Sequence, residues 1–179
     1  MGRLQVMIVL FLMATAAVAT ATTWQVPAEC GTIRAGVDSA AVGDTVLVAC
    51  GTYYEHDIPL GSGVCLLGAS GDPNCVIVDA EHWGRAFRCA NAEQPVTISG
   101  LTVRNGLSGY EDGGGIYCYF SSVVIRDVVI SDNTSYGRGG GLYCDNCEFD
   151  LTGVVFQGNQ THFSSAGGGM YSRSSTGTL

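Results

Sequence analysis

Apolar residues recur along the second half of this 179-residue chain in a pattern that repeats every 26 or 27 positions. Within each repeat they stand two apart, then three apart, then two apart, as in the segment 96–103. Because successive side chains of a strand point to opposite faces, a spacing of two places the apolar side chains on one face. The spacing of three uses one residue for a bend. The pattern predicts two short strands per repeat, both facing one interior.

Four apolar columns result when three repeats are aligned. The columns are Val96, Val123 and Phe149; Ile98, Ile125 and Leu151; Leu101, Val128 and Val154; and Val103, Ile130 and Phe156. The segment 84–89 is a weaker, earlier copy of the repeat. If each repeat is one turn of a solenoid, equivalent strands pair about 4.8 Å apart and the columns become continuous inner ladders. No single turn can bury its apolar face alone, so a stack of turns is predicted.

Glycine and asparagine occupy fixed places in the repeat. Each strand-like piece ends in Asn, at Asn105, Asn133 and Asn159. A glycine triplet, an apolar residue and Tyr follow, with the triplets centred on Gly114, Gly140 and Gly168. Glycine tolerates sharp bends and close backbone approach, and Asn tolerates left-handed corners. We therefore assign these residues structural roles at the corners of the coil.

Other β architectures fit the pattern less well. A β-sandwich with glycine-rich hairpins would not make four columns repeat in step. A leucine-rich repeat has a similar period, but its Leu and Asn pattern is absent and nothing supplies one helix per unit. The composition also favours an all-β chain, because 26 Gly and few apolar spacings of three and four oppose helix, while 46% hydrophobic residues oppose disorder.

At these residues the chain resembles the right-handed parallel β-helix superfamily, which has the pectate-lyase-like fold. Its repeats resemble those of polymorphic outer-membrane proteins, which combine Gly-Gly-Ala-apolar with Phe-x-x-Asn. Residues 156–159 match the second motif outright, whereas residues 130–133 have Ile for Phe and the third glycine replaces Ala throughout. The resemblance implies an all-β, single-stranded, right-handed parallel β-helix in a secreted bacterial protein.

The segment 32–49 resembles the opening of these domains, where a short helix caps the open end of the coil. The residues support this, because Ile33, Val37 and Ala40 or Ala41 fall on one helical face. Val42, Gly43 and Asp44 end the helix before the strand 45–49. A short N-terminal capping helix is therefore expected.

Residues 1–21 have the layout of a signal peptide, with a basic head, an apolar run and small residues before the cleavage point. An uncleaved anchor is the alternative, but the run is shorter than the roughly 20 residues that cross a bilayer. Residues 22–179 then form the parallel β-helix domain, with no transmembrane segment expected in the mature chain. Because the next apolar strand is missing after residues 172–179, we expect a domain truncated at its C-terminus.

The charge narrows the class of partner. The chain has 8 Arg, no Lys and 16 acidic residues, a formal net charge of −8, so it repels polyanions and no nucleic-acid binding is expected. The export signal and the resemblance place it outside the cell, secreted or on the cell surface or outer membrane of a bacterium.

Eight cysteines accompany the export signal, so disulfides can form and persist. Cys89, Cys118 and Cys144 occupy equivalent positions and should stack on neighbouring turns, as bonded pairs or as a buried reduced column. Cys144 and Cys147 have the spacing of a zinc or redox pair. Since there is only one such pair, we interpret it as a disulfide or part of the core, and we expect no metal site.

Tyr117, Tyr143 and Tyr171 recur at one outward position and predict an exposed aromatic column. Such a column could stack on sugar rings or contact another protein, or it could be a packing ladder covered by loops. It is the best candidate for a binding surface. The function predicted is that of a non-catalytic, adhesin-like or structural β-helix that presents an extended surface to a glycan or a surface protein.

The alternative is an enzyme acting on acidic polysaccharide, a pectate-lyase-like lyase or a glycoside hydrolase. The resemblance implies that a lyase would use calcium and an Arg base, and charged residues occur in the repeats. They are Arg104, Arg126, Arg138, Asp127, Asp132 and Asp145. Outward charged residues need no function on a solenoid, and the hydrolase motifs Gly-His-Gly and Arg-Ile-Lys are missing. We therefore assign no catalytic residue and no cofactor. Calcium would be expected only if the chain were a lyase.

Overall fold

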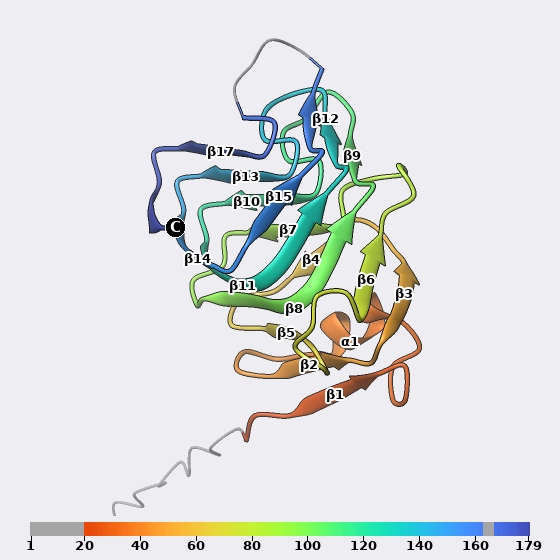
Figure 1. The fold of residues 1–179 in the computed structure, drawn as a ribbon. Coiled ribbons are helices and arrows are strands. Elements are labelled where there is room, and N and C mark those ends of the chain that lie inside the picture. Colours follow the sequence, from red (N-terminus) through yellow and green to blue (C-terminus); the bar gives the residue numbers. More distant parts are fainter. Residues whose placement is uncertain (1–19, 163–166) are drawn as a thin grey trace, which may run out of the picture.

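A computed structural model describes residues 20–162 and 167–179 of the chain, which form a parallel β-solenoid (Figure 1). Nearly all of the predicted signal peptide lies outside the described residues. Strands of each turn pair in parallel with the equivalent strands of the turns above and below. The right-handed sense of the coil stays a prediction, in keeping with the strong preference of parallel crossovers for that hand.

The described strands form four ladders. The first ladder contains β1 (Thr23–Val26), β2 (Thr45–Val48), β5 (Cys65–Gly68), the first halves of β8 (Val96–Arg104) and β11 (Ser122–Ser131), β14 (Glu148–Thr152) and β18 (Thr176–Thr178). The second contains β3 (Gly51–Tyr54), β6 (Val76–Asp79), the second halves of β8 and β11, and β15 (Val155–Gln157).

The third ladder contains β4 (Ile58–Leu60), β7 (Phe87–Ala90), β10 (Ile116–Tyr119), β13 (Leu142–Asp145) and β17 (Met170–Arg173). The fourth is short and contains β9 (Leu107–Ser108), β12 (Thr134–Ser135) and β16 (Gln160–Thr161).

The strand register confirms the predicted columns. Ile98 pairs with Ile125, which pairs with Leu151, and all three side chains are buried. The chain bends between the first and second ladders at the extra residue that the spacing of three provides. It is Gly100, Asp127 or Gly153 in successive turns, with φ of 67°, 51° and 66°. A left-handed corner in each turn therefore keeps both strands facing one core.

The predicted capping helix is α1 (Ile33–Ser39). Thr32 is its N-cap, and the Thr32 hydroxyl accepts a hydrogen bond from the backbone N–H of Ala35 at 3.0 Å. Ile33 and Val37 are buried, and the helix packs on β1, β2 and β4. The helix thus covers apolar side chains of the first turns. Within the described residues no helix is long and apolar enough to cross a membrane.

Of the three asparagines predicted at left-handed corners, Asn105 occupies one, whereas the prediction is wrong for Asn133 and Asn159. Asn105 occupies a left-handed corner with φ of 55°, and its equivalents in the next turns are Asp132 (φ 54°) and Gly158 (φ 64°). Asn133 and Asn159 come one residue later and have no positive φ. The reason is the step length, which is 28 residues from Asn105 to Asn133 but 26 from Asn133 to Asn159.

The glycine triplets divide their two roles between neighbouring residues. The first glycine makes the left-handed bend, as Gly139 does with φ of 64°. The second allows close approach of adjacent turns, since a Cβ on Gly140 would lie 2.2 Å from the carbonyl oxygen of Gln160. A Cβ on Gly114 would likewise lie 2.4 Å from the carbonyl oxygen of Gly140 in the next turn, whereas one on Gly168 would lie 2.8 Å from the carbonyl oxygen of Asn159 in its own turn.

Candidate functional site

An open groove of about 650 Å³ lies on the outer side of the third ladder and is the candidate site. Pro59, Arg88 and Tyr117 occupy one in-register row across β4, β7 and β10. Loops that precede these strands supply the other lining residues. The full lining is Asp57, Pro59, Arg85, Arg88, Glu111, Asp112 and Tyr117, and we call this site the Arg85 groove.

Arg85 is the buried charge of the groove. Its side chain is only 8% exposed, and its guanidinium carbon lies 4.8 Å from the centroid of the Tyr117 ring. The guanidinium forms an ion pair with Glu111, whose own side chain is 75% exposed. A planar cation held against an aromatic face is favourable when it is shielded from water. Arg85 is therefore a fixed part of the groove wall.

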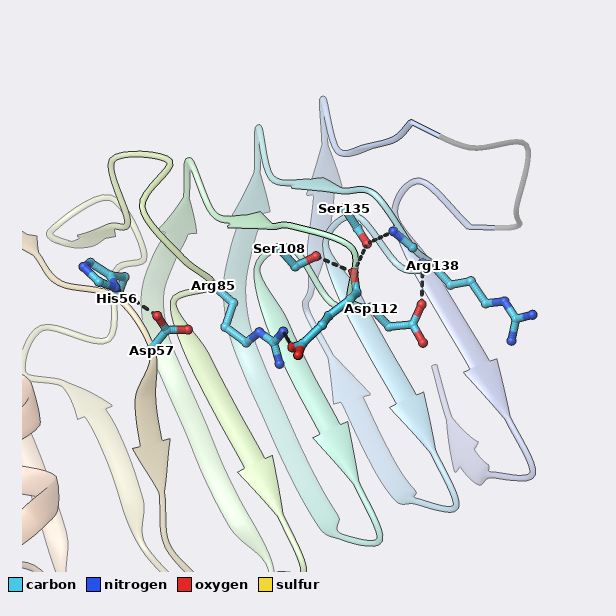
Figure 2. Close-up of polar contacts among 9 residues, drawn as sticks. His56, Asp57, Arg85, Ser108, Asp112, Ser135 and Arg138 are labelled. Atoms are coloured by element: carbon cyan, nitrogen blue, oxygen red, sulfur yellow. Dashed lines mark hydrogen bonds and ion pairs between the residues drawn. The ribbon is translucent and has the colours of Figure 1, made fainter.

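The loop that carries Glu111 and Asp112 is held by the neighbouring turn. The carbonyl oxygen of Glu111 accepts hydrogen bonds from the hydroxyls of Ser108 and Ser135, at 2.8 Å and 3.0 Å. The backbone N–H of Arg138 donates to the Asp112 carboxylate at 2.6 Å (Figure 2). Backbone contacts across two turns thus place both carboxylates at the groove.

On the opposite side, Asp57 lies beside His56, whose Nδ1 is 3.0 Å from the Asp57 carboxylate (Figure 2). Both side chains are about half exposed. Two arginines and three carboxylates therefore line the groove, and one arginine is already paired with one carboxylate.

The tyrosine column occupies the predicted outward position. Tyr117 and Tyr143 are 5.4 Å apart between ring centroids and Tyr143 and Tyr171 are 5.7 Å apart, with planes within 10° and 6° of parallel. Tyr143 is only 4% exposed, whereas Tyr117 and Tyr171 are half buried. The prediction of an exposed column is therefore wrong for Tyr143, whose ring faces are covered by its neighbours.

Arg138 lies over the ring of Tyr171, with its guanidinium carbon 5.1 Å from the centroid. Burial raises the pKa of the Tyr143 hydroxyl, and the charges of Asp112 and Asp145 raise it further. Tyr117 is the member of the column that lines the Arg85 groove.

The charged residues considered for a lyase lie apart. Arg104 pairs with Asp79 at 2.8 Å, and Arg126 pairs with Asp150 at 2.8 Å. Asp127 and Asp132 are corner residues. Of these residues, only Arg138 reaches the loop beside the Arg85 groove.

Asp145 is 2% exposed and accepts a hydrogen bond from Arg173 Nε at 3.1 Å. The hydrogen bonds and charge of Arg173 hold the pKa of the Asp145 carboxyl below its ordinary value. Asp145 is thus committed to a structural pair. Among the described residues, no three His, Cys, Asp or Glu side chains gather in a way that could hold a metal ion.

Sequence reasoning missed the Arg85 groove. One signal was available, because Arg88 in the early copy 84–89 occupies the position equivalent to Tyr117. The loop residues Asp57, Glu111 and Asp112 gave none, since the loops differ in length from turn to turn.

The predicted cysteine stack is confirmed. Cys89, Cys118 and Cys144 are in register and fully buried, and they are free thiols in the structure, as is Cys147. A disulfide joins Cys50 to Cys75 instead.

Residues 127–145 match the Chlamydia polymorphic membrane protein (Chlamydia_PMP) repeat. The matched segment runs from the second half of β11 through β12 to the end of β13 and contains Asn133, the glycine triplet 139–141 and Tyr143. Comparison with curated proteins gave no match, and comparison with solved structures gave none either.

Proposed function

The chain carries a stretch similar to the Chlamydia polymorphic membrane protein repeat within a parallel β-solenoid, and from this premise we propose a surface-exposed, adhesin-like protein that binds glycan in the Arg85 groove. The proposal places it outside the cell, secreted or attached to the surface. The solenoid supplies a rigid, extended face, and the groove supplies the contacts on that face.

The side chains that line the groove support glycan binding. Carboxylates accept hydrogen bonds from sugar hydroxyls and guanidinium groups donate to them, while Pro59 and Tyr117 offer apolar contact. Three carboxylates against two arginines disfavour a polyanion. We therefore expect a neutral, hydroxyl-rich glycan rather than an acidic one.

Contact is expected along the edge of the tyrosine column rather than by stacking on its faces. The faces of Tyr143 are covered by Tyr117 and Tyr171, so a sugar ring has no access to them. The phenol edges of the two half-buried rings extend the surface beyond the groove. A long glycan could then span the turns that follow β10.

Retention of the chain on an array of neutral and acidic glycans tests the proposal. Arg88 is exposed in the groove, so Arg88→Ala should weaken binding of a retained neutral glycan about tenfold. Arg126→Ala removes the same charge on the first ladder and is the matched control, expected to bind as the unmodified chain does. Retention of no glycan, or equal losses in both variants, would contradict the proposal.

A glycoside hydrolase is the second candidate, because Asp57, Glu111 and Asp112 line one groove and hydrolases use pairs of carboxyl groups. The ion pair of Glu111 with Arg85 favours binding over catalysis, since it engages one of the three carboxylates that line the groove. Measuring new reducing ends after incubation with each retained glycan separates the two functions. Product release that Asp112→Asn abolishes would establish the hydrolase.

A further inference from the structure

Four cysteine thiols lie together in the interior of the solenoid. Cys89, Cys118 and Cys144 occupy one register position of β7, β10 and β13, and Cys147 follows Cys144 after the left-handed corner at Asn146 (φ 52°). The first three are 0% exposed and Cys147 is 4% exposed. We call these residues the cysteine row.

The order of contacts in the row is linear. Cys118 is the in-register neighbour of both Cys89 and Cys144, and Cys147 follows Cys144 by three residues. Cys147 also donates through its sulfur to the carbonyl oxygen of Asp145 at 3.4 Å. Each inner thiol has two partners within the row, and each outer thiol has one.

The chain already holds a disulfide with the geometry that the row offers. Cys50 and Cys75 precede the paired residues Gly51 and Val76, so their bond joins in-register positions of adjacent turns. Their Cα atoms are 4.8 Å apart, which is within the ordinary range for disulfides. Cys89 and Cys118 are likewise in register on adjacent parallel strands, for which the spacing is about 4.8 Å.

We propose that, when the chain folds in an oxidising compartment, the cysteine row forms two disulfides, Cys89–Cys118 between turns and Cys144–Cys147 within a turn. In a linear row of four, this pairing leaves no thiol over. A Cys118–Cys144 bond would instead leave Cys89 and Cys147 as single buried thiols. The proposal is independent of the Arg85 groove and of any ligand.

The oxidant is a disulfide, either a small-molecule disulfide or that of a thiol oxidase. For each bond, one thiolate attacks the oxidant and expels a thiolate, and the second thiolate then resolves the mixed disulfide. Two thiols lose two protons and two electrons, and the oxidant becomes two thiols.

Burial fixes when the bonds can form. An oxidant cannot reach thiols that are closed off between turns, so oxidation takes place while the turns assemble. A chain folded under reducing conditions should therefore keep its four thiols when oxidant is added later. Cys65 is only half buried, and its thiol should react first under those conditions.

The test is refolding of the whole chain with either oxidised glutathione or excess dithiothreitol, followed by alkylation in denaturant and peptide mapping by mass spectrometry. After oxidative refolding we expect the peptides joined through Cys89–Cys118 and Cys144–Cys147, together with Cys50–Cys75. Alkylation of all four row cysteines, or a Cys118–Cys144 peptide in their place, would overturn the proposal.

Cys118→Ser gives a second test of the pairing. The variant should gain one alkylated thiol, at Cys89, and keep the Cys144–Cys147 bond. Cys65→Ser is the matched control and should keep both bonds of the row. Alkylation of both Cys144 and Cys147 in Cys118→Ser, with their bond intact in Cys65→Ser, would show that the two bonds do not form independently and would refute the assignment. If Cys118→Ser does not fold, the peptide map of the unmodified chain still decides.

Discussion

Asn133 and Asn159 lie directly over one another inside the solenoid, where Nδ2 of Asn133 donates to Oδ1 of Asn159 at 3.0 Å. Asn133 also accepts from the backbone N–H of Gly106 at 2.7 Å and donates to the carbonyl oxygen of Val103 at 3.2 Å. Asn159 repeats the last contact with Ile130 at 2.7 Å. The two amides thus satisfy backbone groups of the turn before their own, where the coil leaves the second ladder.

Replacing Asn133 by Ala should destabilise the fold by about 3 kcal/mol or more, because the N–H of Gly106 and the carbonyl of Val103 would be buried without partners. Urea denaturation measures the free energy of unfolding. Asn74→Ala, in an exposed turn, should change it by less than about 0.5 kcal/mol. Similar values for the two variants would rule out the role given to the Asn133 amide.

Gly140→Ala should be strongly destabilising, because the added Cβ would lie 2.2 Å from the carbonyl oxygen of Gln160 and 2.6 Å from that of Gly168. Backbone atoms of the next turn cannot move away cheaply, so we expect a loss of about 3 kcal/mol. Gly109→Ala is the matched control, since nothing lies within 4 Å of its added Cβ. A thermal melt of each variant checks the difference, and an unchanged melting temperature for Gly140→Ala would contradict the close packing of turns.

Asp145 predicts a specific pH dependence of stability. Arg173 lowers the pKa of Asp145 in the folded chain below the ordinary value of about 3.9. The stability that the charged Asp145 contributes to the fold is therefore fully present above about pH 4. It is lost as the pH falls through the lower pKa that Asp145 has in the folded chain. In denaturant titrations between about pH 5 and pH 2, Asp145→Asn should reduce the pH slope of the unfolding free energy by up to about one proton.

Asp38→Asn changes an exposed carboxylate on α1 and should keep the pH slope of the unmodified chain. An unaltered slope in Asp145→Asn would mean that the Arg173 pair does not persist in solution.

Arg85→Lys keeps the charge in the groove but loses the planar group that lies over Tyr117 and pairs with Glu111. We expect a loss of about 1–2 kcal/mol in the free energy of unfolding, because the contact with the ring is largely shielded from water. Arg126→Lys alters an exposed pair with Asp150 and should cost less than about 0.5 kcal/mol. Equal effects in chemical denaturation would place Arg85 among ordinary surface arginines.

The repeat of apolar positions was enough to determine the solenoid, because register between turns follows from burying one face of every strand. Ile98, Ile125 and Leu151 had to stack, and with them the cysteines and tyrosines at fixed distances along the repeat. The capping helix was also readable, since its apolar spacing and its N-cap Thr32 are local features. Periodicity thus determined which residues share a column.

What lies between the columns was decided only by the tertiary structure. Asn105 and Asn133 look equivalent in the sequence, but one extra residue in that step separates a corner from an inward amide. The Arg85 groove needed loops from three turns, whose lengths follow no period. Tyr143 is covered because its neighbours stack on both faces of its ring, which no pattern of single residues expresses. Strand pairing that repeats from turn to turn can be predicted from the sequence. The contacts between loops of different length cannot, because they depend on how the loops pack against one another in the folded chain.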